Sequence, residues 1–264
     1  MDSAFPNLIW NQQGHVGVLK LNNPKMLNAL SMALQKDLMG FLPQLNEMQD
    51  LRVVILTGEG KAFCAGGDLK AFCSRYDRYK ERGGLRPVYS NQVAMALLDV
   101  QVPIIAAVNG HAVGGGLTMA LISDLRIASD NARFGAAFVK VGICPEYGSS
   151  FFLSRVVGVT KASEMVLTAR SIDAREALDI RLVSEVVPEE QLMDRAHALA
   201  HEIAQLPPFA VKMAKRVLRH GLESTLQQAM AYEELNETLC FSTADHKEAV
   251  SAFLEKRKPE FIGY

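Results

Sequence analysis

Short apolar segments that end in glycine-rich turns are the feature that most constrains how this chain can fold. Residues 53–58 (VVILTG) and 103–110 (PIIAAVNG) are almost entirely apolar, and residues 16–22 (VGVLKLN) stop at a breaker that ends in Pro24. A strand without polar alternation is buried on both faces, which is typical of a sheet covered by helices. Helical patterns alternate with these strands, so the sequence predicts an α/β protein.

Two regions of helical periodicity divide the chain. Residues 32–48 have apolar side chains at helical spacing, with Ser31 as the expected N-cap. From about Pro207 onward only helical patterns occur, separated by Gly221 and by Ser242-Thr243. We therefore predict a core over residues 1–206 and a helical oligomerisation region over residues 207–264, whose apolar stripes pack on the core or on another subunit.

Composition and charge exclude several classes of protein. The 264 residues are 49% hydrophobic and carry a formal net charge of -1, so the chain can bury a large core and has no global cationic field for nucleic acid. No secretory signal is recognised at the N-terminus, and the mature chain is expected to start there. The uncharged stretch between Asp99 and Asp124 is long enough to span a bilayer, but Pro103, Asn109 and three consecutive glycines favour a buried strand, turn and helix. Neither nucleic acid nor a membrane is an expected partner.

Cysteine and histidine spacing gives no metal motif. The four cysteines have no CxxC spacing, so reduced thiols in a cytosolic-type compartment are expected. His197 and His201 are four residues apart and could reach one metal, but no HExxH motif accompanies them. A solvated helix face is favoured there, and no metal is expected.

Three glycine-rich joints follow predicted strands, at residues 58–70, 109–120 and 141–150. Helix N-termini expose unpaired N–H groups, and glycine lets a ligand approach them, so these joints suit an anionic or carbonyl-oxygen site. The glycine spacing alone does not decide between such a binding site and three tight turns without a ligand. The motifs GxGxxG, Walker A and GxSxG are absent from these joints, so dinucleotide binding, P-loop hydrolysis and α/β-hydrolase chemistry lose their main support.

Five segments carry a family resemblance: LNNPKMLNAL, AFCAGGDL, VNGHAVGGGLTMALISDLRIAS, FGAAFVKVGICPEYGSS and FLEKRKPEF. Together they resemble the crotonase (enoyl-CoA hydratase/isomerase) superfamily from end to end. The resemblance implies a spiral core of ββα turns with a C-terminal helical trimerisation region, assembled as a homotrimer or hexamer. It also implies an enolate formed on an acyl-CoA thioester, with no bound cofactor because the substrate is itself carried on coenzyme A.

The resemblance assigns the two oxyanion donors to the backbone N–H groups of Gly67 and Gly115. Hydratases of this superfamily use two glutamates, whose positions here hold Thr118 and Phe138. Neither side chain exchanges protons near neutral pH, so the acid–base pair for adding water is missing. Glu146 resembles the single carboxylate of the peroxisomal type of Δ3,Δ2-enoyl-CoA isomerase, and the ring-opening isomerase of phenylacetyl-CoA breakdown has an aspartate there.

The catalytic reading of Glu146 has an alternative, in which the carboxylate sits in a first helical turn behind Pro145, where it suits the helix dipole. Asp68 fits a helix cap better than a catalyst. The candidate pocket-wall residues are Phe134, Phe138, Ile143 and Met119, although for each of them taken alone a place in the hydrophobic core is favoured. The residues expected to contact substrate are Lys25, Ala65, Gly66, Asp68, Leu69, Gly114, Thr118, Phe138, Lys258 and Phe261.

Further expectations concern the coenzyme side and the surroundings. Lys25 resembles the adenine and phosphate side of the family's site, and Lys258 and Phe261 resemble C-terminal residues that reach a neighbour's coenzyme. The segment from Arg75 to Arg86 is expected to border the acyl pocket as a loop or helix. The final residues Ile262-Gly263-Tyr264 are not a peroxisomal signal, which favours a bacterial cytoplasm.

Three functions remain in competition at this point. The first is a double-bond shift from position 3 to position 2 of an enoyl-CoA, with Glu146 as the single acid and base. The second is another reaction on the same enolate platform, namely hydration or ring-opening isomerisation. The third is a non-catalytic acyl-CoA-binding subunit.

Overall fold

The computed structural model describes residues 4–74 and 91–263 and contains two β-sheets. The larger sheet has the order β1-β2-β3-β5-β7-β10. β1 pairs antiparallel with β2, and the other neighbours are parallel. The strands are β1 (Leu8–Gln13), β2 (Val16–Leu21), β3 (Val53–Gly58), β5 (Ile104–Val108), β7 (Leu125–Ser129) and β10 (Glu185–Val187). The predicted apolar strands are confirmed, because every residue of β3 and β5 is buried.

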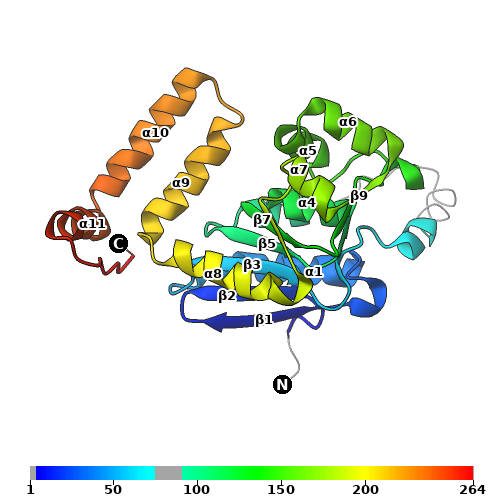
Figure 1. Cartoon of the computed structure of the whole chain (residues 1–264), viewed down its shortest axis with the longest axis horizontal. Coiled ribbons are helices and arrows are strands. Elements are labelled where there is room, and N and C mark those ends of the chain that lie inside the picture. The colour runs from blue at the N-terminus through cyan, green and yellow to red at the C-terminus, as the bar shows by residue number, and fades with distance from the viewer. Residues whose placement is uncertain (1–3, 75–90, 264) are drawn as a thin grey trace.

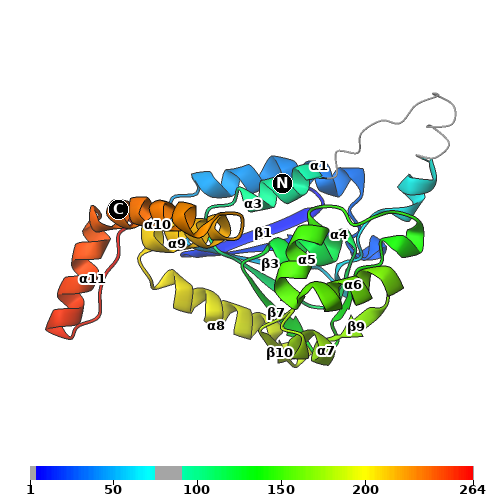
Figure 2. The same ribbon diagram turned by 90° about the horizontal axis from the view of Figure 1, so that it is seen from above.

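Helices cover both faces of this sheet (Figure 2). Val53 and Ile55 of β3 pack with the small side chains of α8 (Leu192–Ala204). Their neighbours Val54 and Leu56 point to the other face, toward the cluster built with α1 (Met32–Phe41), α3 (Asn91–Leu98) and α4 (Gly115–Ile122). Successive side chains of a strand alternate between faces, so one apolar run serves two cores. The predicted α/β layout is confirmed.

The smaller sheet has the order β4-β6-β8-β9 and positions the pocket. Its strands are β4 (Ala62–Cys64), β6 (His111–Val113), β8 (Arg133–Gly135) and β9 (Ser171–Asp173). β4, β6 and β8 run parallel, whereas β9 is antiparallel to β8. The carboxyl ends of the three parallel strands therefore meet at one edge. The predicted joints at residues 58–70 and 109–120 each contain one of these short strands, β4 and β6, and the joint at residues 141–150 follows η3 (Val139–Val141) and not a strand as expected.

The helix predicted over residues 32–48 is shorter than expected. Ser31 caps it as predicted, since its hydroxyl accepts a hydrogen bond from Leu34 N at 3.2 Å. The α-helix ends at Phe41, however, and a 3-10 helix, η2 (Leu42–Glu47), continues the chain. Pro43 explains the change, because a proline inside an α-helix removes one N–H donor and clashes with the preceding turn.

The remaining helices follow the smaller sheet and the chain's last third. α5 (Ser149–Val157) and α6 (Val159–Thr168) precede β9 in the chain, and α7 (Ala174–Asp179) follows it. The short 3-10 helices are η1 (Pro24–Met26), η3 (Val139–Val141) and η4 (Glu189–Gln191). α9 (Pro208–Gly221), α10 (Leu226–Phe241) and α11 (Ala244–Glu255) extend away from the sheets (Figure 1). The predicted helices of this region are confirmed, whereas its independence as a domain stays a prediction.

An ionic cluster holds α9 on the core. Lys215 is buried and donates to Val102 O at 2.7 Å, and its ammonium lies 2.7 Å from the Asp124 carboxylate. Arg219 contacts the same carboxylate at 3.0 Å and donates to Leu98 O. Burial lowers the pKa of Lys215 to about 8.

The uncharged stretch that ends at Asp124 forms β5, β6 and α4. Within the described ranges, no helix is long and apolar enough to cross a membrane.

Candidate active site

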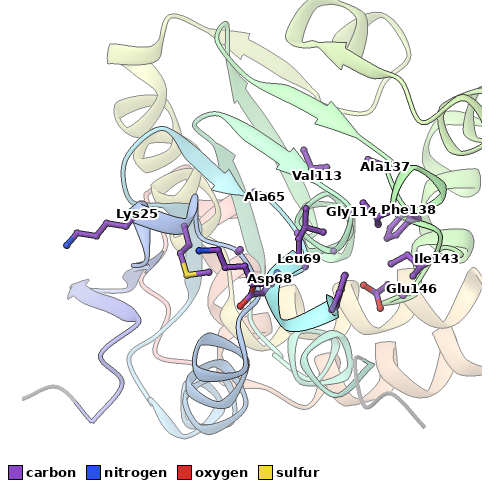
Figure 3. Close-up of a pocket in the computed structure, with 18 residues that line it drawn as sticks. Lys25, Ala65, Asp68, Leu69, Val113, Gly114, Ala137, Phe138, Ile143 and Glu146 are labelled. Carbon is purple, nitrogen blue, oxygen red and sulfur yellow. Dashed lines mark hydrogen bonds between the residues drawn. The ribbon is translucent and has the colours of Figure 1, made fainter. Parts of the chain in front are cut away.

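A pocket of about 490 Å³ lies where the three glycine joints meet (Figure 3). Its lining comes from η1 and the residues after it, and from the segments that follow β4, β6 and β8. In Figure 3, Phe138, Ile143 and Glu146 lie on one side and Lys25 and Asp68 on the other. The lining residues are Lys25, Met26, Ala29, Ala65, Gly66, Gly67, Asp68, Leu69, Lys70, Phe72, Val113, Gly114, Gly115, Ala137, Phe138, Val141, Ile143 and Glu146.

The first joint follows β4 and is held by backbone contacts. Ala65 N donates to Leu27 O at 2.9 Å, and Leu30 N donates to Gly66 O at 2.7 Å. Gly66 has φ +86°, and a Cβ there would stand 2.5 Å from Val113 O. Only glycine tolerates both that conformation and that approach. These contacts place Gly67 on the pocket wall, and its role as an oxyanion donor stays a prediction.

The second joint follows β6 and opens α4. Gly114 precedes the helix with φ +54°, and Gly115 is its first residue. The N–H of a first helical residue has no partner within the helix, and the positive end of the macrodipole lies there. A Cβ on Gly116 would stand 2.0 Å from Cys64 O, so glycine at this position lets α4 pack directly on the first joint. Both predicted oxyanion donors therefore belong to one pocket.

Asp68 caps the helical residues 69–74. Its carboxylate accepts hydrogen bonds from Lys70 N at 3.0 Å and from Ala71 N at 3.2 Å. The capping role expected from the sequence is confirmed. Leu69 and Phe72 of this helix line the pocket, and the Phe72 ring is so close that a Cβ on Gly67 would stand 2.4 Å from it.

Glu146 lies in the third joint, between η3 and α5. Its side chain is partly buried and lines the same pocket as Gly67 and Gly115. The alternative of a first-turn residue behind Pro145 is wrong, because α5 begins at Ser149, whose N–H donates to Glu146 O at 3.0 Å. The intervening Tyr147 has φ +59° and Gly148 has φ +83°, so a tight left-handed turn separates the carboxylate from the helix.

Three expected site residues lie elsewhere. Thr118 is fully buried away from the pocket lining, and its hydroxyl donates to Gly114 O at 3.2 Å. Phe134 and Met119 belong to the hydrophobic core, whereas Phe138 and Ile143 form part of the pocket wall as expected. A helical hydroxyl on the buried side can bond the carbonyl one turn earlier, which removes it from the substrate side.

The predicted coenzyme contacts divide into two groups. Lys25, on η1, lines the pocket. Lys258 instead borders a separate cavity of about 520 Å³ near the C-terminus, and Phe261 O accepts a hydrogen bond from Arg52 at 2.8 Å. Their expected contact with a neighbour's coenzyme stays a prediction. The segment 75–86 lies outside the described residues.

Among the residues that the structure describes, a few groups in the pocket could take part in chemistry. Its charged lining residues are Lys25, Asp68, Lys70 and Glu146. Burial raises the pKa of the Cys64 thiol to about 12, so that cysteine beside the first joint is neutral and is a poor nucleophile. All four cysteines are free thiols. In the described part of the chain, no group of three His, Cys, Asp or Glu side chains could hold a metal ion.

Several lining residues were missed by sequence reasoning. Phe72, Val113 and Ala137 are ordinary core types, and no motif distinguishes them from buried residues elsewhere. Phe72 had one available signal, because Asp68 was expected to cap a helix and position 72 lies one turn beyond the cap. Spacing did not predict the close approach at Gly116, because that contact depends on how α4 packs on the β4 joint.

Comparison with known proteins places this pocket in a family. The sequence profile "Enoyl-CoA hydratase/isomerase" matches residues 11–263. The chain is 40% identical to a short-chain-enoyl-CoA hydratase of Clostridium acetobutylicum, over 96% of this chain and 97% of that protein. It is 38% identical to the 2,3-dehydroadipyl-CoA hydratase of Escherichia coli K12, over 97% and 98% of the two chains.

Solved structures confirm the predicted crotonase-like fold. The crystal structure of enoyl-CoA hydratase from Bacillus anthracis matches with a TM-score of 0.90 and 35% identity, covering 98% of this chain and 100% of that one. A form of enoyl-CoA hydratase subunit I from Geobacillus kaustophilus gives a TM-score of 0.89 and 34% identity, covering 99% and 100%. The chain therefore belongs to the enoyl-CoA hydratase/isomerase family, as an enzyme that acts on acyl-CoA thioesters.

Proposed function

We propose that this enzyme moves a double bond from position 3 to position 2 of an enoyl-CoA, with Glu146 as its single acid and base. The observation that carries the proposal is that Glu146 lines the same pocket as Gly67 and Gly115, the two residues whose N–H groups would hold the thioester oxygen. A 1,3-proton shift needs one carboxylate near two carbons and an oxyanion site for the intermediate. In this proposal the pocket lining supplies the carboxylate through Glu146 and the oxyanion site through Gly67 and Gly115.

Each step uses groups of this chain. The Glu146 carboxylate removes a proton from C2 of the 3-enoyl chain, and the electron pair moves onto the thioester oxygen. The N–H groups of Gly67 and Gly115 stabilise that oxyanion, a contribution worth on the order of 10²–10³ in rate for each donor. Protonated Glu146 then returns the proton to C4, which restores the carboxylate and leaves the double bond between C2 and C3. No atoms are gained or lost overall.

The pocket lining also suits this chemistry. Leu69, Phe72, Phe138 and Ile143 contribute apolar surface to the pocket that Glu146 lines. Apolar surroundings strengthen both a carboxylate base and an oxyanion donor, because less water competes for either. They also suit the hydrocarbon part of an acyl chain.

Hydration is the second candidate, and the names of the relatives favour it. The similar proteins from C. acetobutylicum and E. coli are both named hydratases. The family's hydratase glutamates correspond to positions 118 and 138, which hold a buried threonine and a phenylalanine here. Glu146 would have to act on water alone in such a reaction. Ring-opening isomerisation and a non-catalytic acyl-CoA-binding role are the remaining alternatives.

One assay separates these candidates. Purified enzyme is given a 3-enoyl-CoA and, separately, a 2-enoyl-CoA in ¹⁸O-labelled water, and products are identified by mass spectrometry. Isomerisation produces 2-enoyl-CoA of unchanged mass, whereas hydration adds labelled oxygen. Glu146→Gln should lower isomerase kcat by at least about 10³-fold, because the amide can neither take nor return a proton. An undiminished Glu146→Gln enzyme would rule out the proposed mechanism.

We further propose that the enzyme works as a homotrimer or hexamer in a bacterial cytoplasm. The support is a set of exposed apolar side chains on α10 and α11, including Leu226, Phe253 and Leu254, each at least 71% exposed, together with the bacterial source of several relatives. Light scattering of the wild type and of Phe253→Asp tests the assembly. A monomeric wild type would contradict it.

A further inference from the structure

Tyr147 and Gln35 are joined by a hydrogen bond behind the pocket, and neither belongs to its lining. The Tyr147 hydroxyl donates to Gln35 Oε1 at 3.0 Å, across 112 residues of sequence. Tyr147 is 3% exposed and follows Glu146 directly, whereas Gln35 lies on α1. The bond therefore connects the turn that carries the proposed base to a helix from the first part of the chain.

Gln35 makes a second contact, which leads to the first glycine joint. Its Nε2 donates to Leu30 O at 2.7 Å. Leu30 N in turn donates to Gly66 O at 2.7 Å, and Leu30 forms a parallel bridge with Gly67. The Gln35 amide thus accepts a hydrogen bond from Tyr147 of the third joint. It also donates one to Leu30, whose backbone pairs with the first joint.

Gly115 completes this arrangement from the second joint. A Cβ on Gly115 would stand 2.7 Å from Leu30 Cδ1 and 3.6 Å from the Tyr147 ring. Leu30 and Tyr147 therefore both pack on the residue whose N–H is the second proposed oxyanion donor. The Gln35 amide links these two packing residues to each other.

The backbone of the third joint needs such a restraint. Tyr147 has φ +59°, a conformation that bulky L-residues adopt only where surrounding contacts impose it. A small rotation in this turn would move Glu146 relative to the bound acyl chain, and misplacement by about 1 Å can cost on the order of 10² in rate. The Tyr147–Gln35 hydrogen bond opposes that rotation.

We propose that Gln35 and Tyr147 are positioning residues that hold Glu146 at a fixed distance from the Gly67 and Gly115 amides. Neither touches substrate, so neither is a catalytic residue. The inference rests on the proposed isomerase function, and it adds that the base is aligned through a side-chain contact reaching α1.

The test uses Tyr147→Phe, which removes the hydroxyl and keeps the ring on Gly115. Isomerase kcat should fall about five- to twentyfold, the effect of one lost hydrogen bond expressed in the transition state, with KM changed less than about twofold. Gln35→Met should lower kcat at least as much, because it also loses the bond to Leu30 O. Gln44→Met is the matched control, since that amide donates to Gly40 O at 3.0 Å and to no other group among the described residues, and it should retain wild-type kcat.

A double-mutant cycle separates coupling from general weakening of the fold. If the two residues act through their shared hydrogen bond, the double variant should be no slower than the slower single variant. Losses that multiply would overturn the proposal, as would an unchanged kcat in Tyr147→Phe beside an inactive Glu146→Gln. Activity is measured well below each variant's melting temperature. A wild type without isomerase turnover, or a fully active Glu146→Gln, would overturn the proposed function and this inference together.

Discussion

The first two glycine joints and the third joint contribute to one pocket by different physical means. The first two present backbone N–H groups, and glycine at positions 66 and 116 lets their chains approach within contact distance of Val113 O and Cys64 O. The third presents a side chain, Glu146, from a turn whose neighbour Tyr147 is anchored by a side-chain hydrogen bond. Backbone donors depend on the path of the chain, whereas the proposed acid–base group depends on one residue and its anchor.

This difference matters for how chemistry varies within a family. On the proposed mechanism, the joints that carry the oxyanion donors stay unchanged while the catalytic carboxylate lies at position 146 instead of at positions 118 and 138. A change of a few side chains then changes the reaction without altering the oxyanion site. The predictions below compare the two kinds of joint, from the largest expected effect on the enzyme to the smallest.

Among these comparisons, bulk at the second joint should have the largest effect. Gly115→Ala places a methyl group 2.7 Å from Leu30 Cδ1, so either that side chain or the amide must shift. We expect isomerase kcat to fall about 10²–10³-fold, as for loss of one oxyanion donor. Gly221→Ala is the control, because a Cβ there meets nothing within 4 Å. A Gly115→Ala enzyme with near wild-type kcat would remove Gly115 from the oxyanion site.

Shortening the acid–base group should have an intermediate effect. Glu146→Asp keeps the carboxylate but withdraws it by one methylene, so steady-state kcat should fall about ten- to a hundredfold. KM should change little, because the coenzyme contacts remain. The same replacement at Glu202, whose side chain is 68% exposed on α8, should have no effect on turnover. Equal rates for Glu146→Asp and wild type would mean that carboxylate position is not critical.

Removing the Thr118 hydroxyl should have a small effect on turnover. Thr118→Val loses the bond to Gly114 O but keeps the packing shape, so kcat should stay within about threefold while the free energy of unfolding drops by about 1 kcal/mol. Steady-state kinetics and denaturant unfolding measure the two quantities. A large loss of kcat at unchanged stability would show instead that the hydroxyl acts on substrate.

The stability contributed by the segment after the third joint, which includes α7, should decrease modestly at acid pH. Glu176 on α7 hydrogen-bonds to Arg170 and Lys161, and these contacts lower its pKa from 4.5 to about 2. Its contribution to stability is therefore complete above about pH 4.5 and is lost as the pH falls toward 2. The groups are largely solvent-accessible, so the melting temperature of Glu176→Gln should lie only a few degrees below that of wild type at pH 6.

The gap between Glu176→Gln and wild type should narrow by pH 3 and close only as the pH approaches 2 in calorimetry. Glu189→Gln on η4 serves as a comparison, since its carboxylate accepts a hydrogen bond from the neutral amide of Asn131, at 2.7 Å. A gap that stays constant from pH 6 to pH 3 would contradict the role of the ion pairs.

Much of the fold was predictable because it follows local rules. The buried strands β3 and β5 could be predicted from their apolar runs, and Ser31 and Asp68 could be predicted as helix caps. The prediction for residues 32–48 was too long, because apolar spacing continues past Pro43 although the α-helix cannot. The spacing of apolar residues indicates which side chains are buried. It does not indicate which backbone hydrogen bonds can form.

The site was predictable only in part. Gly67, Gly115 and Glu146 were identified through the family resemblance, and all three line one pocket. Thr118, Phe134 and Met119 were expected near the substrate, but they face the core, because a helix or strand position does not by itself say which side carries the ligand. The Tyr147–Gln35 contact had no sequence signal at all, since 112 residues separate its partners.

The sequence by itself determined the alternation of buried strands and helices, the glycine joints and the identity of the one acid in the third joint. These depend on local properties, namely side-chain polarity, backbone freedom and motif identity. Only the tertiary structure decided that the three joints open into the same pocket and that Glu146 stands on a turn braced from α1. Those relations arise because parallel strands bring distant segments to one edge of a sheet, and no local pattern encodes which distant segments will meet.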